Sequence, residues 1–197
     1  MFKRAGLIAA LLISACSSTP DTPPTTALPD TVHYLQTDPR WADDRLGRTP
    51  GDTMGTDGCL VAAVAMAMTN LGHRIDPGRL NRELTRANAF TPRGYLVWRG
   101  VADVSEGRIR AHYHDQVSAA LIRSCIAADQ YPLVRFVLPS GRTHWAMIVA
   151  EAPLSNGKTG YRMRDPLRDY DKPLLFPRDA DAFEALRCIG VGEVATA

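Results

Sequence analysis

The chain has 197 residues, of which 45% are apolar and 22% are charged. This length suits one globular domain with a sizeable core, and the apolar fraction excludes a wholly disordered chain. The 23 basic and 21 acidic side chains nearly balance. We therefore expect no nucleic-acid partner. The one long apolar run, at residues 5–15, is too short to span a bilayer comfortably, which excludes a multi-pass membrane protein.

The first fifteen residues have the layout of a secretory signal. Lys3 and Arg4 precede an apolar stretch, and small residues lead up to Cys16. A cysteine in this position resembles the signal of bacterial lipoproteins. The resemblance implies cleavage after residue 15, a lipid on Cys16 and attachment to a membrane through this anchor. Ser17 follows the cysteine, which by the same resemblance favours the outer membrane, facing the periplasm. An ordinary signal peptide is the alternative.

Residues 16–31 are rich in proline and threonine and show no apolar periodicity. This composition favours an extended, solvated chain, so we expect a tether between the membrane and the domain. A loop packed on the domain is the alternative. The domain itself is expected at residues 32–197, beginning with a short strand or extended segment at residues 32–36.

The first predicted helix starts at Cys59, after a loop rich in glycine and aspartate. No polar residue lies between Cys59 and Thr69, and alanine and methionine dominate the segment. A helix that is apolar on every face is buried on every face, so we expect this one at the centre of the domain. Gly72 supplies a stop signal. Thr56 or Asp57 is expected to cap the start.

The remaining elements follow from periodicity and from turn residues. Asp76 and Pro77 mark the start of a second helix. Helices are predicted at residues 77–87, 95–103, 115–129 and 179–188, and strands at residues 108–114, 131–138, 143–152 and 160–164. Because helices come first and strands later, the predicted class is α+β, with the buried helix packed on an antiparallel sheet.

The cysteines are informative once Cys16 is set aside. Cys59, Cys125 and Cys188 remain, an odd number for an exported protein, so one stays free or pairs between molecules. An oxidising periplasm favours a disulfide where the geometry allows one. Cys125 and Cys188 are the candidate pair, which would leave Cys59 as the free thiol, although the sequence leaves the other pairings open.

Three residues at the edges of elements are candidates for chemistry. Cys59 opens the buried helix, where free backbone N–H groups and the helix dipole favour the thiolate. A buried, inert cysteine is the alternative. His144 opens an apolar strand, which would hold a general base rigidly. Asp165 ends the next strand and can accept the other imidazole N–H. Asp169 and Asp171 are rivals for that role, but their surroundings indicate a loop.

Gln36, at the end of the first extended segment, supplies an amide that can donate to an oxyanion. The order Gln36, Cys59, His144, Asp165 resembles the papain-like cysteine peptidases and, more narrowly, the bacteriocin-processing (double-glycine) peptidase-like family. The similarity spans about residues 33–170, and the motifs that carry it lie at residues 36–41, 57–60, 143–145 and 164–166.

The resemblance implies a papain-like fold and a role for each of the four residues. Cys59 would be the nucleophile, His144 the base and acid, Asp165 the residue that orients the imidazole, and Gln36 the oxyanion donor. It also implies a peptide or protein substrate and no cofactor. Leu60 stands where the processing enzymes usually have glycine, so cleavage after a double-glycine leader is not expected.

The expected function is therefore a cysteine hydrolase of the cell envelope. Two alternatives stay open: a catalytically inactive binding lipoprotein of the same fold, and an amidase or transpeptidase acting on peptidoglycan stem peptides. His112 and His114 share a strand face, but no third ligand has metal-site spacing near them, so no metal is expected. Trp145 is a candidate to shield the His144–Asp165 bond from water. The sequence does not indicate an oligomeric state.

Overall fold

The structure is a computed structural model, and it describes residues 27–192. Its centre is a six-stranded sheet in the order β1-β6-β2-β3-β4-β5, with every neighbouring pair antiparallel. The strands are β1 (Ile109–His114), β2 (Tyr131–Val137), β3 (Thr143–Pro153), β4 (Thr159–Arg164), β5 (Leu174–Phe176) and β6 (Ala185–Val191). The fold class is α+β, as the sequence predicts.

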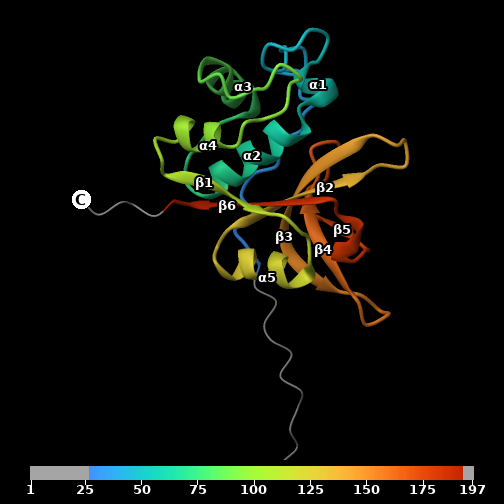
Figure 1. Cartoon of the computed structure of the whole chain (residues 1–197). Helices are drawn as coiled ribbons and strands as arrows, with labels where there is room; N and C mark the ends of the chain where they lie inside the picture. Colours follow the sequence, from blue (N-terminus) through green and yellow to red (C-terminus); the bar gives the residue numbers. More distant parts are fainter. Residues whose placement is uncertain (1–26, 193–197) are drawn as a thin grey trace, which may run out of the picture.

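Helices cover the sheet unevenly. They are α1 (Met54–Asp57), α2 (Cys59–Asn70), α3 (Pro77–Arg86), α4 (Arg99–Val104), α5 (Ala119–Ala127) and a 3₁₀ turn, η1 (Ala180–Ala182). Figure 1 shows α1 to α4 grouped on one side of the sheet and α5 on the other. Among the described residues, no helix is long and apolar enough to cross a membrane.

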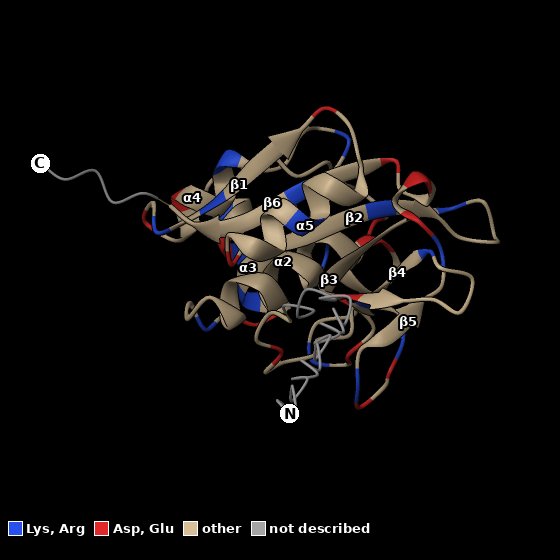
Figure 2. Cartoon of the chain, turned by 90° about the horizontal axis from the view of Figure 1, so that it is seen from below, with Lys and Arg blue, Asp and Glu red and all other residues tan. Residues whose placement is uncertain are grey.

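The predicted central helix is confirmed as α2. Its eight consecutive residues 61–68 are all buried, and it packs against β2, β3 and β6. It carries no charged side chain, whereas Lys, Arg, Asp and Glu are scattered over the other elements and the loops (Figure 2). The chain leaves the helix at Gly72, with φ 90°, and His73 N–H donates to the Met68 carbonyl. This is a Schellman ending, which requires the left-handed conformation that glycine adopts readily.

The helix predicted at residues 179–188 is wrong, because this segment forms η1 and then β6. Ala185, Leu186 and their neighbours have good helix propensity, but β6 lies between β1 and β2 and pairs with both. Pairing on two sides outweighs the local preference. The short edge strand β5 was not predicted either. The other predicted helices and strands are present with shifted ends. The largest shifts are at α4, which begins at Arg99 instead of residue 95, and at α5, which begins at Ala119 instead of residue 115.

The domain begins earlier than the sequence predicts. Leu28 is buried, and its N–H donates to the Val149 carbonyl at 2.8 Å. Asp30 forms a bidentate ion pair with the buried Arg164. Residues 28–31 are therefore packed on the domain. This agrees with the alternative of a packed loop and not with a tether over these residues. Residues 32–36 form no regular strand and continue as an extended segment. The signal sequence, Cys16 and the rest of the expected tether lie outside the described residues.

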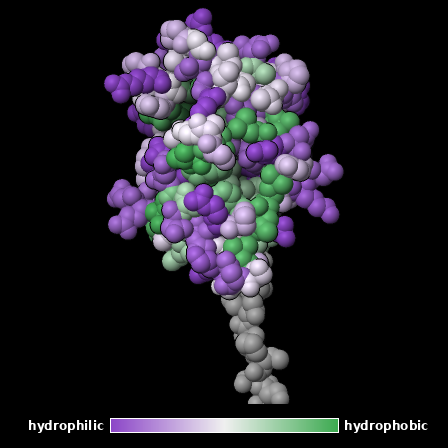
Figure 3. Space-filling model, turned by 90° about the vertical axis from the view of Figure 1, so that its right-hand side faces the viewer, coloured by the Kyte–Doolittle hydropathy of each residue, from purple (hydrophilic) through white to green (hydrophobic). Residues whose placement is uncertain are grey.

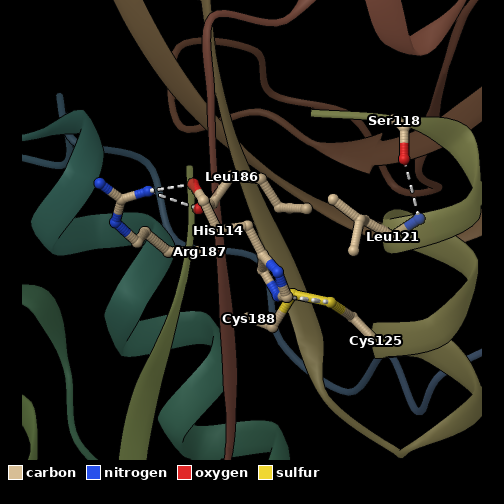
Figure 4. The surroundings of a disulfide bond; sticks show 7 residues. All are labelled: His114, Ser118, Leu121, Cys125, Leu186, Arg187 and Cys188. Carbon is tan, nitrogen blue, oxygen red and sulfur yellow. Dashed lines mark hydrogen bonds between the residues drawn. A yellow bond between two sulfur atoms is a disulfide. The ribbon is translucent and has the colours of Figure 1, made fainter. Parts of the chain in front are cut away.

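A disulfide joins Cys125 on α5 to Cys188 on β6 and leaves Cys59 free (Figure 4). The His114 ring lies beside this bond, with Nε2 3.7 Å from the sulfur of Cys125. Both sulfurs are engaged in the disulfide, so neither is a thiolate available to a metal. His112 is not part of this group.

Candidate active site

A cleft of about 610 Å³ contains three of the four predicted site residues. Gln36, Cys59 and His144 all line it, together with Trp98 and Trp145. Figure 3, which views the molecule from the right-hand side of Figure 1, shows apolar residues gathered in the middle of that face between hydrophilic ones. Asp165 does not line the cleft but stands behind His144.

Cys59 is the first residue of α2, and the local sequence leaves that helix end open. Thr53 and Thr56 form a capping box for the preceding turn, α1, so neither Thr56 nor Asp57 caps α2 as predicted. Gly58 takes the cap position without a side chain. A Cβ there would lie 2.4 Å from the carbonyl oxygen of Met54, so only glycine fits this close approach. The first N–H groups of α2 therefore have no side-chain cap and can receive an anion.

His144 and Asp165 are joined by a short hydrogen bond. His144 Nε2 lies 2.6 Å from Asp165 Oδ1, and the two side chains are 2% and 14% exposed. The same carboxylate oxygen accepts the Leu167 N–H at 2.9 Å, which fixes its orientation. The carboxylate that serves His144 is thus Asp165 and neither Asp169 nor Asp171. Since Nε2 is occupied, Nδ1 is the ring nitrogen left for Cys59.

The two partners change each other's ionisation. Burial alone would lower the pKa of His144, but its hydrogen bonds with Asp165 and Cys59, together with their negative charge, raise that pKa to about 9. Burial opposes ionisation of Asp165, but the bond from His144 and its positive charge lower the pKa of Asp165 below the usual range. At neutral pH the pair is therefore an imidazolium and a carboxylate.

Cys59 lies close enough to the imidazole of His144 to raise the pKa of His144. Within residues 27–192, no hydrogen bond of standard geometry joins Cys59 to His144, as is common in catalytic sites without substrate. The aromatic ring that covers the imidazole is Phe136, packed edge-on at 5.4 Å. Trp145, the candidate to shield the His144–Asp165 bond, packs on Trp98 and lines the same cleft as His144.

Gln36 is 2% exposed and is held at both ends. Its backbone N–H donates to the Pro166 carbonyl at 2.9 Å, and its Nε2 donates to the Gly55 carbonyl at 2.8 Å. In a continuous helix, the Cys59 N–H would donate to the carbonyl of Gly55, four residues earlier. Here that carbonyl accepts the Gln36 amide instead. Within residues 27–192, the second N–H of Gln36 Nε2 and the backbone N–H of Cys59 have no hydrogen-bond partner, so both can serve a ligand in the cleft.

Two further residues hold the site together, and reasoning from the sequence did not identify them. Arg142 Nη2 donates to the Thr56 carbonyl at 2.8 Å and to Asp57 Oδ1 at 2.9 Å. It thereby ties the start of the His144 strand to the turn before Cys59. The ring of His33 lies 3.0 Å from the carbonyl oxygen of Asp165. Arg142 precedes Thr143-His144 in the sequence, but its partners become evident only in the fold.

No protein-family model matches the chain, and no curated protein matches it. The structure brings together a free thiol at a helix start, an imidazole bound to a carboxylate, and two N–H donors. Such a set can form and break a thioester. Within residues 27–192, the group with metal-ligand spacing is His114 with Cys125 and Cys188, which contain the disulfide sulfurs.

Proposed function

We propose that this protein is a papain-like cysteine hydrolase of the bacterial cell envelope, similar to the bacteriocin-processing peptidase-like family. It cleaves a peptide or amide bond through a thioester on Cys59. The observation that carries the proposal is the buried 2.6 Å bond between His144 and Asp165, directly behind the cleft that Cys59 and Gln36 line.

The chemistry proceeds in two stages. The Cys59 thiolate attacks the carbonyl carbon, and the oxyanion that forms receives the Cys59 backbone N–H and the Gln36 amide. One donor of this kind typically lowers the barrier by about 3 kcal/mol. His144 then gives its Nδ1 proton to the nitrogen of the leaving amine, the C–N bond breaks, and a thioester remains.

Water completes the reaction. His144, now neutral, takes a proton from a water molecule, which attacks the thioester carbonyl. The C–S bond breaks, the acid is released, and Cys59 regains its thiolate beside the imidazolium. Asp165 keeps Nε2 as a donor throughout, so that Nδ1 faces the reacting atoms in both stages. These steps use only groups of this chain and one water molecule.

We further propose that the mature chain is anchored by a lipid on Cys16 and faces the periplasm from the outer membrane. A peptide or protein of that compartment is then the natural substrate. The oxidising environment fits the Cys125–Cys188 disulfide.

The test is product formation by the full chain and by Cys59→Ala, with two substrates. One is a mixed peptide library, and the other is purified peptidoglycan. Cleavage that adds one water for each bond broken and is absent from Cys59→Ala supports hydrolysis. Products joined to a new amine indicate a transpeptidase, and release of stem peptides from peptidoglycan alone indicates an amidase. Equal product patterns for both proteins contradict the proposal.

A further inference from the structure

The cleft holds more positive charge than the neighbouring acidic side chains neutralise. The arginines that line it are Arg93, Arg135, Arg142 and Arg187, and the acidic residues are Asp52 and Asp57. Arg135 pairs with Glu184, and Arg142 pairs with Asp57. Of the residues that the structure describes, none with a carboxylate lies within ion-pair distance of Arg187 or of Arg93, which stands on an exposed loop.

Arg187 is better placed than Arg93 to bind a ligand, because contacts within the protein hold its guanidinium and leave one edge free. It lies 4.2 Å over the ring of Tyr113 and 5.8 Å from the ring of Trp98. Its Nη1 donates to the carbonyls of Leu186 and His114 (Figure 4). The side chain is thus already held in place before a ligand arrives, which reduces the entropy cost of binding.

The strand beneath Arg187 is fixed as well. Figure 4 shows Arg187 on one side of β6 and Cys188, with its disulfide to Cys125 on α5, on the other. The disulfide therefore anchors the strand from the face opposite the cleft.

The remaining edge of the guanidinium has no partner. Nε is buried and makes no hydrogen bond, and Nη2 makes none with residues 27–192. Together, Nε and Nη2 form the side of an arginine that binds a carboxylate through two parallel hydrogen bonds. A donor left buried and unpaired is unfavourable, and a ligand carboxylate on this edge would relieve that penalty.

We propose that Arg187 is the anchor for a carboxylate of the substrate, so that the cleft selects acidic peptides. This inference rests on the proposed function, since the cleft that Arg187 lines is the one that holds Cys59. Trp98 and Trp145, which line the same cleft, place an apolar surface beside the anchor. The carboxylate belongs either to an aspartate or glutamate side chain or to the end of a peptide.

The first arm of the test compares electrophilic peptides that differ in one charge. Tripeptidyl vinyl sulfones carry glutamate or the nearly isosteric glutamine at each position in turn, and the rate of Cys59 labelling is measured on the full chain. Addition of the thiolate to the vinyl carbon needs a reactive cysteine but no amide cleavage. We expect glutamate at one position to label about 10- to 100-fold faster than glutamine.

Two variants show whether Arg187 is responsible. Arg187→Gln should abolish the preference for glutamate over glutamine at that position. Arg110→Gln is the matched control, because Arg110 is an exposed arginine of β1 that does not line the cleft. It should keep the full preference. Where Arg187→Gln does not fold, Arg187→Lys keeps the charge but loses the two-bond edge, and it should keep only part of the preference.

The second arm tests a chain-end carboxylate. Peptides that end in a free acid or in an amide compete with iodoacetamide for Cys59, and stronger protection by the acid forms indicates this source. No preference for acids in either arm, or a preference that survives in Arg187→Gln, overturns the inference. Acid preference without hydrolysis of any substrate would refute the proposed function and leave the subsite standing. Hydrolysis without acid preference would refute the subsite and leave the proposed function standing.

Discussion

Replacing Asp165 by asparagine should remove the support that keeps His144 protonated. The pKa of His144 is raised to about 9, against about 6.5 for an ordinary histidine. A group whose pKa is raised on folding stabilises the fold fully below the unfolded pKa, and that contribution disappears as the pH rises through the folded pKa. The shift corresponds to about 3 kcal/mol of stability, an upper limit for Asp165 because Cys59 supplies part of it.

The wild-type protein should therefore lose stability between about pH 6.5 and 9, equivalent to roughly 6–12 °C in Tm for a domain of this size. In Asp165→Asn this loss should disappear, because the buried imidazole is then neutral across the range. Activity at pH 7.5 should fall at least tenfold, since His144 is almost wholly protonated there when its pKa is about 9 and at most about 9% protonated when its pKa is 6.5 or lower.

The assay is thermal unfolding followed by circular dichroism across this pH range, with an NMR titration of the five histidines. His144→Ala identifies the His144 signal. Asp169→Asn is the matched control, because Asp169 is an exposed carboxylate of the following loop and should behave like wild type. A histidine that still titrates near pH 9 in Asp165→Asn, or equal pH dependence in both variants, would refute the reasoning.

Three other changes probe the parts around this pair. Gln36→Ala should lower kcat about 10²- to 10³-fold while iodoacetamide still alkylates Cys59 at a near wild-type rate; unchanged kcat would exclude Gln36 as an oxyanion donor. Gly58→Ala should cost about 1–3 kcal/mol in chemical unfolding, and a neutral effect would contradict the close approach. Cys125→Ser with Cys188→Ser should cost about 4 kcal/mol for a separation of 63 residues, with Cys59 alkylation preserved; a stability equal to wild type would argue against the bond.

The sequence predicts those features that one segment specifies alone. The unbroken apolar run after Cys59 predicts α2, and Asp76 with Pro77 predicts the start of α3, where the Asp76 side chain accepts the Arg79 N–H. His144 and Asp165 are identifiable because each stands at the end of an apolar strand. Since β3 and β4 pair directly, the fold brings these two ends together.

The sequence does not predict features that depend on distant partners. Residues 185–188 favour a helix locally, yet they form β6 because two strands bind it. Leu28 stands in a polar, proline-rich segment, and only its hydrogen bond to Val149 shows that it packs on the domain. Arg142 and His33 act on backbone carbonyls of other segments, and carbonyl groups carry no sequence signal.

The central claim is that Cys59, His144 and Asp165 act as one unit. The rate of Cys59 alkylation by iodoacetamide at pH 6 tests it most directly, because an unassisted thiol is almost wholly protonated there. Fast alkylation in the wild type, with a large decrease in both His144→Ala and Asp165→Asn, is the result we predict. A wild-type rate no higher than that of a free cysteine, or rates that neither substitution changes, would contradict it.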